Sequence, residues 1–145
     1  LTTHKTWWRD QMPDNFIWIR ADLADFWRLL HDELARRGER LYKHFILYPN
    51  PWPKIGHLKR RWHGHAVFPT MVALGGTLEC RSNWPVYVRE FAFAVRHVAG
   101  VEPESIGQLP IIEPITPFER KYHARGEPLF MCRFELPSRL PLCCP

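Results

Sequence analysis

The sequence predicts an α/β fold, because short apolar segments alternate along the chain with segments of helical periodicity. The apolar segments have the length of strands, and Gly, Pro, Asn or Asp residues separate them from the helical patterns. Neither an internal repeat nor a low-complexity linker interrupts this alternation. We therefore expect a single domain over residues 1–145.

The first predicted elements are a strand and a helix. Residues 16–19 form an apolar run that stops at Asp22, which is typical of a buried strand. The segment ADFWRLLHDELARRG follows, and Gly38 is a typical helix end. Four apolar residues of this segment recur at helical spacing: Phe26, Leu29, Leu30 and Leu34.

The middle of the chain predicts two more strands with a short helix between them. Residues 42–49 contain a continuous apolar run, which is typical of a strand in a sheet covered on both faces. Residues 65–76 predict a short helix closed by two glycines, and residues 77–83 predict the third strand.

The clearest helical pattern covers residues 84–99. Pro85 suits the first turn of a helix. Six apolar residues share one face of this helix: Trp84, Tyr87, Val88, Phe91, Val95 and Val98. The chain that follows is rich in Pro and Gly until residues 128–136, which predict the last strand.

Composition and charge limit the class of protein. Hydrophobic residues make up 46% of the chain, including seven Trp and nine Phe, which is enough for a core and excludes a disordered tail. The net charge of +5 and a pI near 9.3 suit a polyanionic partner without requiring one. No stretch reaches the ~18 apolar residues of a membrane span, so we expect no membrane partner.

The chain has four cysteines: Cys80, Cys132, Cys143 and Cys144. None forms the C-x-x-C pair that zinc sites use, so we expect reduced thiols in a cytoplasmic protein. Three histidines lie close together in the sequence: His57, His63 and His65. No carboxylate lies near them in the sequence, so we expect no metal site.

Three predicted strands end in a polar residue: Asp22, Asn50 and Asn83. In an open parallel sheet, ligands bind beyond the carboxyl ends of the strands. Asp and Asn are also common in turns and helix caps, and each residue alone has that simpler interpretation. Together, and with a Trp soon after Asn50 and Asn83, they predict one pocket with an aromatic wall.

Three motifs in this order resemble the tRNA (guanine-N7)-methyltransferase family: YPNPWPKIGHLKRR, SNWPVYV and ITPFERKYHARG. Members of that family have Pro-Asp-Pro-Trp-Pro-Lys at a strand end, then Thr-Asp-Trp before a helix and Thr-x-Phe-Glu near the end. The resemblance covers roughly residues 15–130. It implies a class I methyltransferase (Rossmann-like) fold, with helices on both faces of a mostly parallel sheet and an antiparallel last strand. It also implies S-adenosyl-L-methionine as cofactor and tRNA as substrate.

The sequence departs from the family pattern in two respects. The glycine-rich loop that holds the methionine end of the cofactor has no counterpart, and residues 1–12 align with the helix after the family's second strand. We therefore expect the first two strands to be absent, so that residues 1–145 are the C-terminal part of a methyltransferase domain. Asn50 and Asn83 stand where the family has Asp, and Asn keeps a carbonyl acceptor but lacks the charge.

The resemblance implies roles for the matching residues. Asn50 is the implied catalytic residue, and Asp22 and Asn50 are the implied cofactor contacts. The implied substrate-binding residues are Lys54, Asn83, Thr116, Phe118 and Glu119. Guanine N7 has a free lone pair, so no general base is required, and catalysis is mostly positioning and electrostatics.

Two of these roles have simpler alternatives. Asp22 is also a suitable N-cap for the following helix. Phe118 is alternatively a core residue, with Glu119 paired at the surface with Arg120 or Lys121.

A basic segment (residues 54–65) begins at the end of the Pro-rich turn (residues 49–54). Its cations that we expect to contact the RNA backbone are Lys59, Arg60 and Arg61. Trp52 and Trp62 lie among them, as groups that stack on splayed bases do, and residues 51–78 contain no Asp or Glu. The alternative is a solvated charged face without a partner.

Three functions are compatible with the sequence. The first is methylation of guanine N7 in tRNA. The second is a related methyltransferase with an altered target, marked by Asn50 and Asn83, and the third is a non-catalytic RNA-binding relative. The sequence leaves open the modified nucleotide and the oligomeric state.

Overall fold

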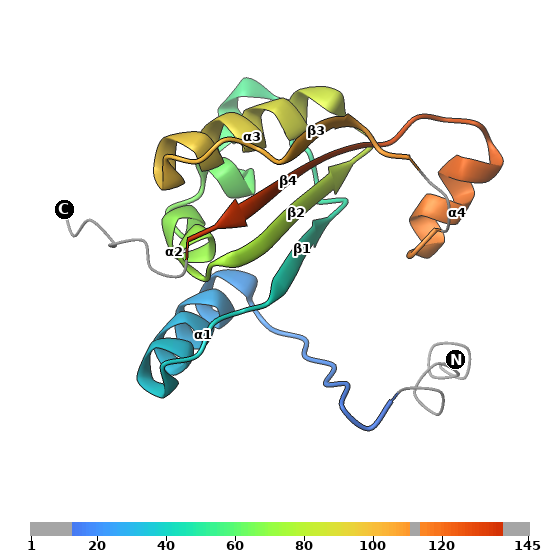
Figure 1. Cartoon of the computed structure of the whole chain (residues 1–145). Helices are drawn as coiled ribbons and strands as arrows, with labels where there is room; N and C mark the ends of the chain where they lie inside the picture. The colour runs from blue at the N-terminus through green and yellow to red at the C-terminus, as the bar shows by residue number, and fades with distance from the viewer. Residues whose placement is uncertain (1–12, 111–113, 138–145) are drawn as a thin grey trace.

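The computed structural model describes residues 13–110 and 114–137. Its elements in chain order are α1 (Leu23–Arg37), β1 (Lys43–Leu47), the 3₁₀ helices η2 (Ile55–Arg60) and η3 (Trp62–Gly64), α2 (Phe68–Ala73), β2 (Gly76–Ser82), α3 (Pro85–Ala99), β3 (Ser105–Gln108), α4 (Pro117–Ala124) and β4 (Phe130–Leu136). The strands form a four-stranded sheet in the order β1-β2-β4-β3 (Figure 1). None of the helices in the described ranges is long and apolar enough to cross a bilayer.

The sheet is mixed. Strands β1 and β2 pair in parallel, with Ile46 opposite Cys80. Strand β4 pairs antiparallel with both β2 and β3. The α/β class and the antiparallel last strand are therefore confirmed, while the parallel part of the described sheet is limited to β1 and β2.

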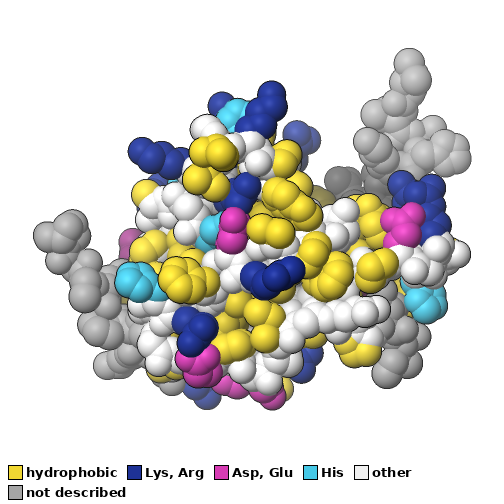
Figure 2. All heavy atoms as spheres, turned by 90° about the horizontal axis from the view of Figure 1, so that it is seen from above, with side chains coloured by type: hydrophobic (Ala, Val, Ile, Leu, Met, Phe, Trp, Pro, Cys, Tyr) yellow, Lys and Arg dark blue, Asp and Glu magenta, His cyan; other side chains and the backbone are white. Residues whose placement is uncertain are grey.

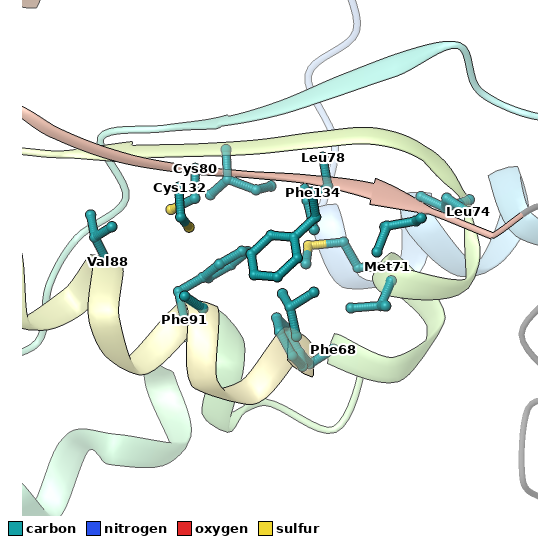
Figure 3. Packing of buried hydrophobic residues seen from close by; sticks show 14 of the residues in the cluster. Phe68, Met71, Leu74, Leu78, Cys80, Val88, Phe91, Cys132 and Phe134 are labelled. Atoms are coloured by element: carbon teal, nitrogen blue, oxygen red, sulfur yellow. The ribbon is translucent and has the colours of Figure 1, made fainter. Parts of the chain in front are cut away.

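The larger of two hydrophobic clusters lies between the sheet and helices α1, α2 and α3. The smaller one consists of Leu109, Leu129 and Met131, with Tyr48, Phe118 and Tyr122 packed against it. Side chains alternate along a strand, so Leu78 of β2 and Phe134 of β4 share the core face. Figure 3 shows these side chains pointing toward Phe91 of α3 and Phe68 of α2. Full burial of a Phe side chain stabilises the fold by about 1.5–3 kcal/mol. The packing of α3 confirms the apolar face that the sequence predicted for residues 84–99.

Helix α1 has the predicted position, but its buried face differs from the prediction. Gly38 ends the helix in the left-handed conformation, with φ of 67°. Trp27 is buried and packs edge-on against Trp62 with ring centroids 4.8 Å apart, whereas Leu29 is 70% exposed. Trp27 lies three residues before Leu30 and therefore shares its face of the helix, which Leu29 does not.

Residues 16–19 do not form the predicted strand. They have no regular secondary structure, and Ile17 and Trp18 are 79% and 65% exposed. A strand requires a neighbour for its backbone hydrogen bonds, and none of the described strands pairs with this segment. The prediction fails because an apolar run does not reveal whether a partner strand is present.

Strand β1 is covered on one face only. Ile46 is buried in the core, but Phe45 and Leu47 on the opposite face are 40% and 37% exposed. The expectation of a sheet covered on both faces is therefore wrong for β1 within the described residues. The reason is that β1 lies at the edge of the described sheet, and α1, α2 and α3 pack on its other face.

Candidate active site

The Pro-rich segment leaves the carboxyl end of β1 through a constrained turn. Tyr48 and Trp52 have φ of 51° and 44°, which non-glycine residues rarely adopt and which costs on the order of 1–3 kcal/mol each. The three prolines of the segment restrict the backbone further. The Oδ1 atom of Asn50 accepts a hydrogen bond from the backbone N–H of Trp52 at 3.2 Å, so the Asn50 side chain is held by the turn itself.

Arg61 fastens this turn to α3. Its guanidinium donates to the carbonyl oxygen of Trp52 through Nε at 3.2 Å and Nη2 at 3.1 Å, and it forms an ion pair with Glu90. The Arg61 side chain is buried and lies over the ring of Trp84. This placement argues against contact between Arg61 and an RNA phosphate in the described conformation.

The other cations of the basic segment face solvent. Lys54 precedes η2 and is exposed, as is Lys59. Arg60 is also exposed, and its guanidinium lies over the ring of Trp52 at 5.0 Å from the centroid. The structure therefore separates the predicted cations into an internal one, Arg61, and exposed ones that remain available to an anion.

Glu119 joins the turn to α4. Its carboxylate is fully buried, and Oε1 accepts from the hydroxyl of Tyr48 at 2.5 Å and from Nη1 of Arg81 at 2.9 Å. Its Oε2 accepts from the backbone N–H of Ile115 at 2.7 Å. Both oxygens of Glu119 therefore already accept hydrogen bonds from the protein.

Thr116 caps α4, because its Oγ1 accepts from the backbone N–H of Glu119 at 3.1 Å. The alternative interpretation of Glu119, a surface pair with Arg120 or Lys121, is wrong, since its side-chain partners are Tyr48, which follows β1, and Arg81 of β2. Figure 1 shows α4 beyond the carboxyl ends of β1 and β2, the edge where the sequence predicted a site.

The electrostatics of this cluster favour an ionised Glu119. Burial alone would raise the pKa of Glu119, but hydrogen bonds from Tyr48, the Ile115 N–H and Arg81 outweigh it and hold this pKa below its usual value. Burial, together with the bond to Glu119, raises the pKa of Tyr48, so its phenol stays protonated. The Tyr48 hydroxyl therefore serves as a hydrogen-bond donor.

A second buried carboxylate, Glu79, extends the cluster across the sheet. It accepts from Nε of Arg81 at 2.6 Å and from Nη2 of Arg133 at 2.8 Å, and Nζ of Lys43 lies 3.6 Å away. Burial would raise the pKa of Glu79, but the bonds from Arg81 and Arg133 hold it below its usual value. Arg81 therefore bridges Glu79 and Glu119.

A set of aromatic rings lies beside these charges. Tyr48 stacks on Phe118 at 4.3 Å between centroids, and Phe118 stacks on Tyr122 at 4.4 Å. The Nδ2 of Asn83 donates to the hydroxyl of Tyr122 at 3.0 Å. The three sequence motifs thus meet in space: Tyr48 directly precedes the Pro-rich turn, Asn83 directly follows β2, and Phe118 lies in α4.

Sequence reasoning missed Tyr48, Arg81 and Tyr122. A signal existed for Arg81, because Glu79 and Arg81 are charged residues inside a predicted strand, two apart and hence on one face. Phe118 and Tyr122 are four residues apart, a spacing that pairs side chains on a helix, but no helix was predicted in this part of the chain, which is rich in Pro and Gly.

Asp22 lies apart from this cluster, at the start of α1. Its Oδ1 accepts hydrogen bonds from the backbone N–H of Ala24 at 2.9 Å and of Asp25 at 3.3 Å. The interpretation of Asp22 as the N-cap of α1 is therefore confirmed. None of the hydrogen bonds among the described residues joins Asp22 to the Pro-rich turn.

The fit of these residues to S-adenosylmethionine is partial. Both cap bonds of Asp22 go to Oδ1, which leaves Oδ2 to accept from an amine such as that of adenine. Asn50 uses Oδ1 within the turn and keeps the Nδ2 donor. In the described part of the chain, no group of three His, Cys, Asp or Glu residues is arranged to hold a metal ion.

Comparison with known proteins gives consistent matches. A family described as "Putative methyltransferase" matches residues 9–132. A protein of Zymomonas mobilis named tRNA (guanine-N(7)-)-methyltransferase is 25% identical over 123 residues, which is 79% of this chain and 51% of that protein. A protein of the same name from Bordetella pertussis is 27% identical over 137 residues, 74% of this chain and 52% of that protein. Another, from Paramagnetospirillum magneticum, is 32% identical over 96 residues, 59% of this chain and 39% of that protein. The chain thus spans about half the length of the first two relatives.

Proposed function

We propose, from the premise that the chain belongs to this methyltransferase family, that it acts in S-adenosylmethionine-dependent methylation of guanine N7 in tRNA. The observation that carries the proposal is the meeting of three motifs at the carboxyl ends of β1 and β2. Tyr48, which directly precedes the Pro-rich turn, donates a hydrogen bond to Glu119 of α4, and Asn83 donates one to Tyr122. The relatives named tRNA (guanine-N(7)-)-methyltransferase support the choice of substrate, and a cytoplasmic location is part of the proposal.

In the proposed reaction, the main task of the protein is to align the guanine with the methyl donor. When bound, S-adenosylmethionine supplies an electrophilic methyl group. Guanine N7 offers a lone pair, so no protein group has to remove a proton. The residues of the turn hold Asn50 at a fixed place, which suits the alignment of a nucleophile with a methyl group. We propose that Asn50 contacts the reacting groups and that Asp22 contacts the cofactor.

The aromatic rings and exposed polar groups supply the proposed binding of guanosine. Phe118 belongs to a stacked set of rings and packs against a small buried cluster, in agreement with the core alternative, so its contact with guanosine stays a prediction. Asn83 and Lys54, which belong to the other two motifs, are exposed. Thr116 caps α4 and thereby fixes its start.

Glu119 would have to release a bond to Tyr48, Arg81 or Ile115 to accept from guanine N1 and N2. We therefore propose that Glu119 positions the turn against α4, and direct contact with guanosine stays a prediction.

Nucleoside analysis of tRNA tests the proposal. Bulk tRNA is incubated with the protein and S-adenosylmethionine, digested, and analysed for 7-methylguanosine. Asn50→Asp should preserve or raise its formation, because a carboxylate offsets the positive charge of the methylated ring. The matched control is Asn15→Asp, which adds the same charge on an exposed residue outside the sheet and should leave formation unchanged.

The second candidate function is a related methyltransferase with another target, favoured by the presence of Asn at both positions 50 and 83. It predicts a different methylated nucleoside that disappears in Asn50→Asp. The absence of any methylated nucleoside, with RNA binding retained, would instead favour the non-catalytic RNA-binding relative.

A further inference from the structure

An open groove of about 1120 Å³ lies along α3, between that helix, the start of α2 and the basic segment. Its wall is mostly apolar and includes Phe68, Pro69 and Phe93. The ring of Phe93 is 70% exposed, although the other face of α3 is buried in the core. Figure 2 looks onto this side of the molecule and shows hydrophobic side chains interspersed with Lys, Arg and His.

The charges of the groove are predominantly positive. Lys59 and Arg89 line it, and neither forms an ion pair with a described residue. The acidic residue in its lining is Glu90, whose carboxylate is already bonded to Arg61 and to Nε2 of His63 at 3.1 Å. Two cations of the groove are therefore left to an external anion.

His65 adds a directed polar group to the groove. Its Nδ1 accepts from the backbone N–H of Val67 at 3.1 Å, so in the neutral ring the proton lies on Nε2. Nε2 is thus a donor for a carbonyl or phosphate oxygen. An aromatic surface, two cations and a neutral donor are the groups that bind a nucleobase together with its phosphate.

We propose that this groove binds one unpaired nucleotide of an RNA, with its base against Phe93 and its phosphate at Lys59 and Arg89. The inference rests on the proposed function, because it takes RNA to be the substrate. Charge complementarity selects the occupant, since an apolar peptide would leave both cations without a partner, whereas a nucleotide satisfies the cations and the aromatic surface.

The groove adjoins the candidate active site through one residue. Arg61 bonds to Glu90 in the groove wall and to the carbonyl oxygen of Trp52 in the Pro-rich turn. An RNA strand that crosses the basic segment would therefore contact both places. The groove would serve as an anchor for the substrate outside the reacting site.

Phe93 gives the sharpest test of base binding. Fluorescence anisotropy, without cofactor, compares a short single-stranded RNA with an abasic strand of the same length. If the base stacks on Phe93, the abasic strand should bind the unmodified protein more weakly than the intact strand does. The ratio of the abasic Kd to the intact Kd should therefore fall by roughly 5- to 100-fold in Phe93→Ala. The matched control is Leu29→Ala, because Leu29 is also 70% exposed but lies on α1, and it should leave the ratio unchanged.

The cations are tested by salt dependence. Lys59→Gln and Arg89→Gln should each reduce the slope of log K against log salt by about one unit, as for the loss of one phosphate contact. Arg28→Gln is the control, since Arg28 lies on α1 and is paired with Asp25, and its slope should equal that of the unmodified protein.

Three results would overturn the inference: no RNA binding, an unchanged Kd ratio in Phe93→Ala, or an unchanged slope in Arg89→Gln. RNA binding that is indifferent to both substitutions would point to a groove for another protein. None of these results would decide the proposed function, which is measured by 7-methylguanosine formation. Conversely, the expected changes without any methylation would support the groove and reject the methyl transfer.

Discussion

The two faces of strand β2 hold different kinds of interaction. Leu78 and Cys80 point into the apolar core, where they pack with α3 and β4. Glu79 and Arg81 point to the opposite face, where buried carboxylates and guanidinium groups are joined by hydrogen bonds. The seven residues of β2 therefore contribute to the hydrophobic core on one face of the sheet and to a network of buried ion pairs on the other.

This difference separates stability from positioning. Apolar burial is non-directional and supplies most of the free energy of folding. A buried ion pair contributes little net stability, because desolvation opposes the attraction, but its hydrogen bonds fix distances and angles. The charged face links β2 to Glu119 and hence to α4 and the Pro-rich turn, so we interpret it as the part that positions the candidate active site.

The largest effect is expected on the apolar face. Phe134→Ala should lower the free energy of unfolding by about 3–5 kcal/mol, because it leaves a cavity beside Phe91 and Met71. Phe93→Ala is the matched control, and its exposed ring should account for less than about 0.5 kcal/mol. Urea denaturation measures both. A loss below about 1 kcal/mol in Phe134→Ala would contradict the described core.

The two faces should also respond to acid in different pH ranges. Burial lowers the pKa of His44, on the core face of β1, to about 4, and its Nε2 has no hydrogen-bond partner among the described residues. Between the unfolded pKa of about 6.5 and pH 4, the unfolded chain binds a proton that the folded protein does not. The free energy of unfolding should therefore decrease as the pH is lowered through this range, by at most about 1.4 kcal/mol per pH unit for one histidine.

Glu79 and Glu119 should act at lower pH. Their folded pKa values lie below the usual value, so their contribution is present above the unfolded pKa of about 4.3 and is lost as pH falls through the folded values. Urea denaturation from pH 7 to pH 3 should show two successive losses of stability, one between about pH 6.5 and pH 4 and one at lower pH. His44→Leu should reduce the loss at the higher pH. An unchanged loss at the higher pH in His44→Leu would assign it to other groups, such as His63, whose pKa is also lowered by burial.

The smallest effect is expected outside both faces, at the cap of α1. Asp22→Ala should lower the free energy of unfolding by about 1 kcal/mol, because two backbone N–H groups lose their acceptor. Calorimetry with S-adenosylmethionine on the same variant tests the proposed cofactor contact, which predicts affinity weaker by on the order of 1–3 kcal/mol. Reduced stability with unchanged affinity would leave Asp22 as a cap alone.

The apolar face was predictable from the sequence, and the charged face was not. The core residues of α3 recur every three or four positions, so a local pattern reveals them. The charged face depends on pairs that are far apart in the chain: Tyr48 and Glu119 are separated by 71 residues, and Glu79 and Arg133 by 54. No periodicity connects such pairs, and the resemblance named Glu119 without its partners.

The errors have the same origin. Residues 16–19 and residues 42–49 both have the composition of buried strands, but burial depends on which neighbours are present. Arg61 and Lys59 are similar in sequence context, yet Arg61 points inward to Glu90, which a charge pattern does not show. The sequence predicted Asp22, Asn50 and Asn83 in one pocket at the carboxyl ends of the strands, but Asp22 lies apart, at the start of α1. The structure was needed to show which side chains join the remaining motifs.

Hydrogen exchange in Glu119→Gln tests most directly whether the charged face positions the site. Loss of the carboxylate weakens its bonds to Tyr48 and Arg81, and α4 should open more often. We predict that backbone amides of α4 exchange roughly 5- to 100-fold faster, as for the loss of a charge-assisted hydrogen bond, while those of α3 keep their protection. Unchanged protection of α4, or an equal loss in α3 and α4, would contradict the assignment of positioning to the charged face.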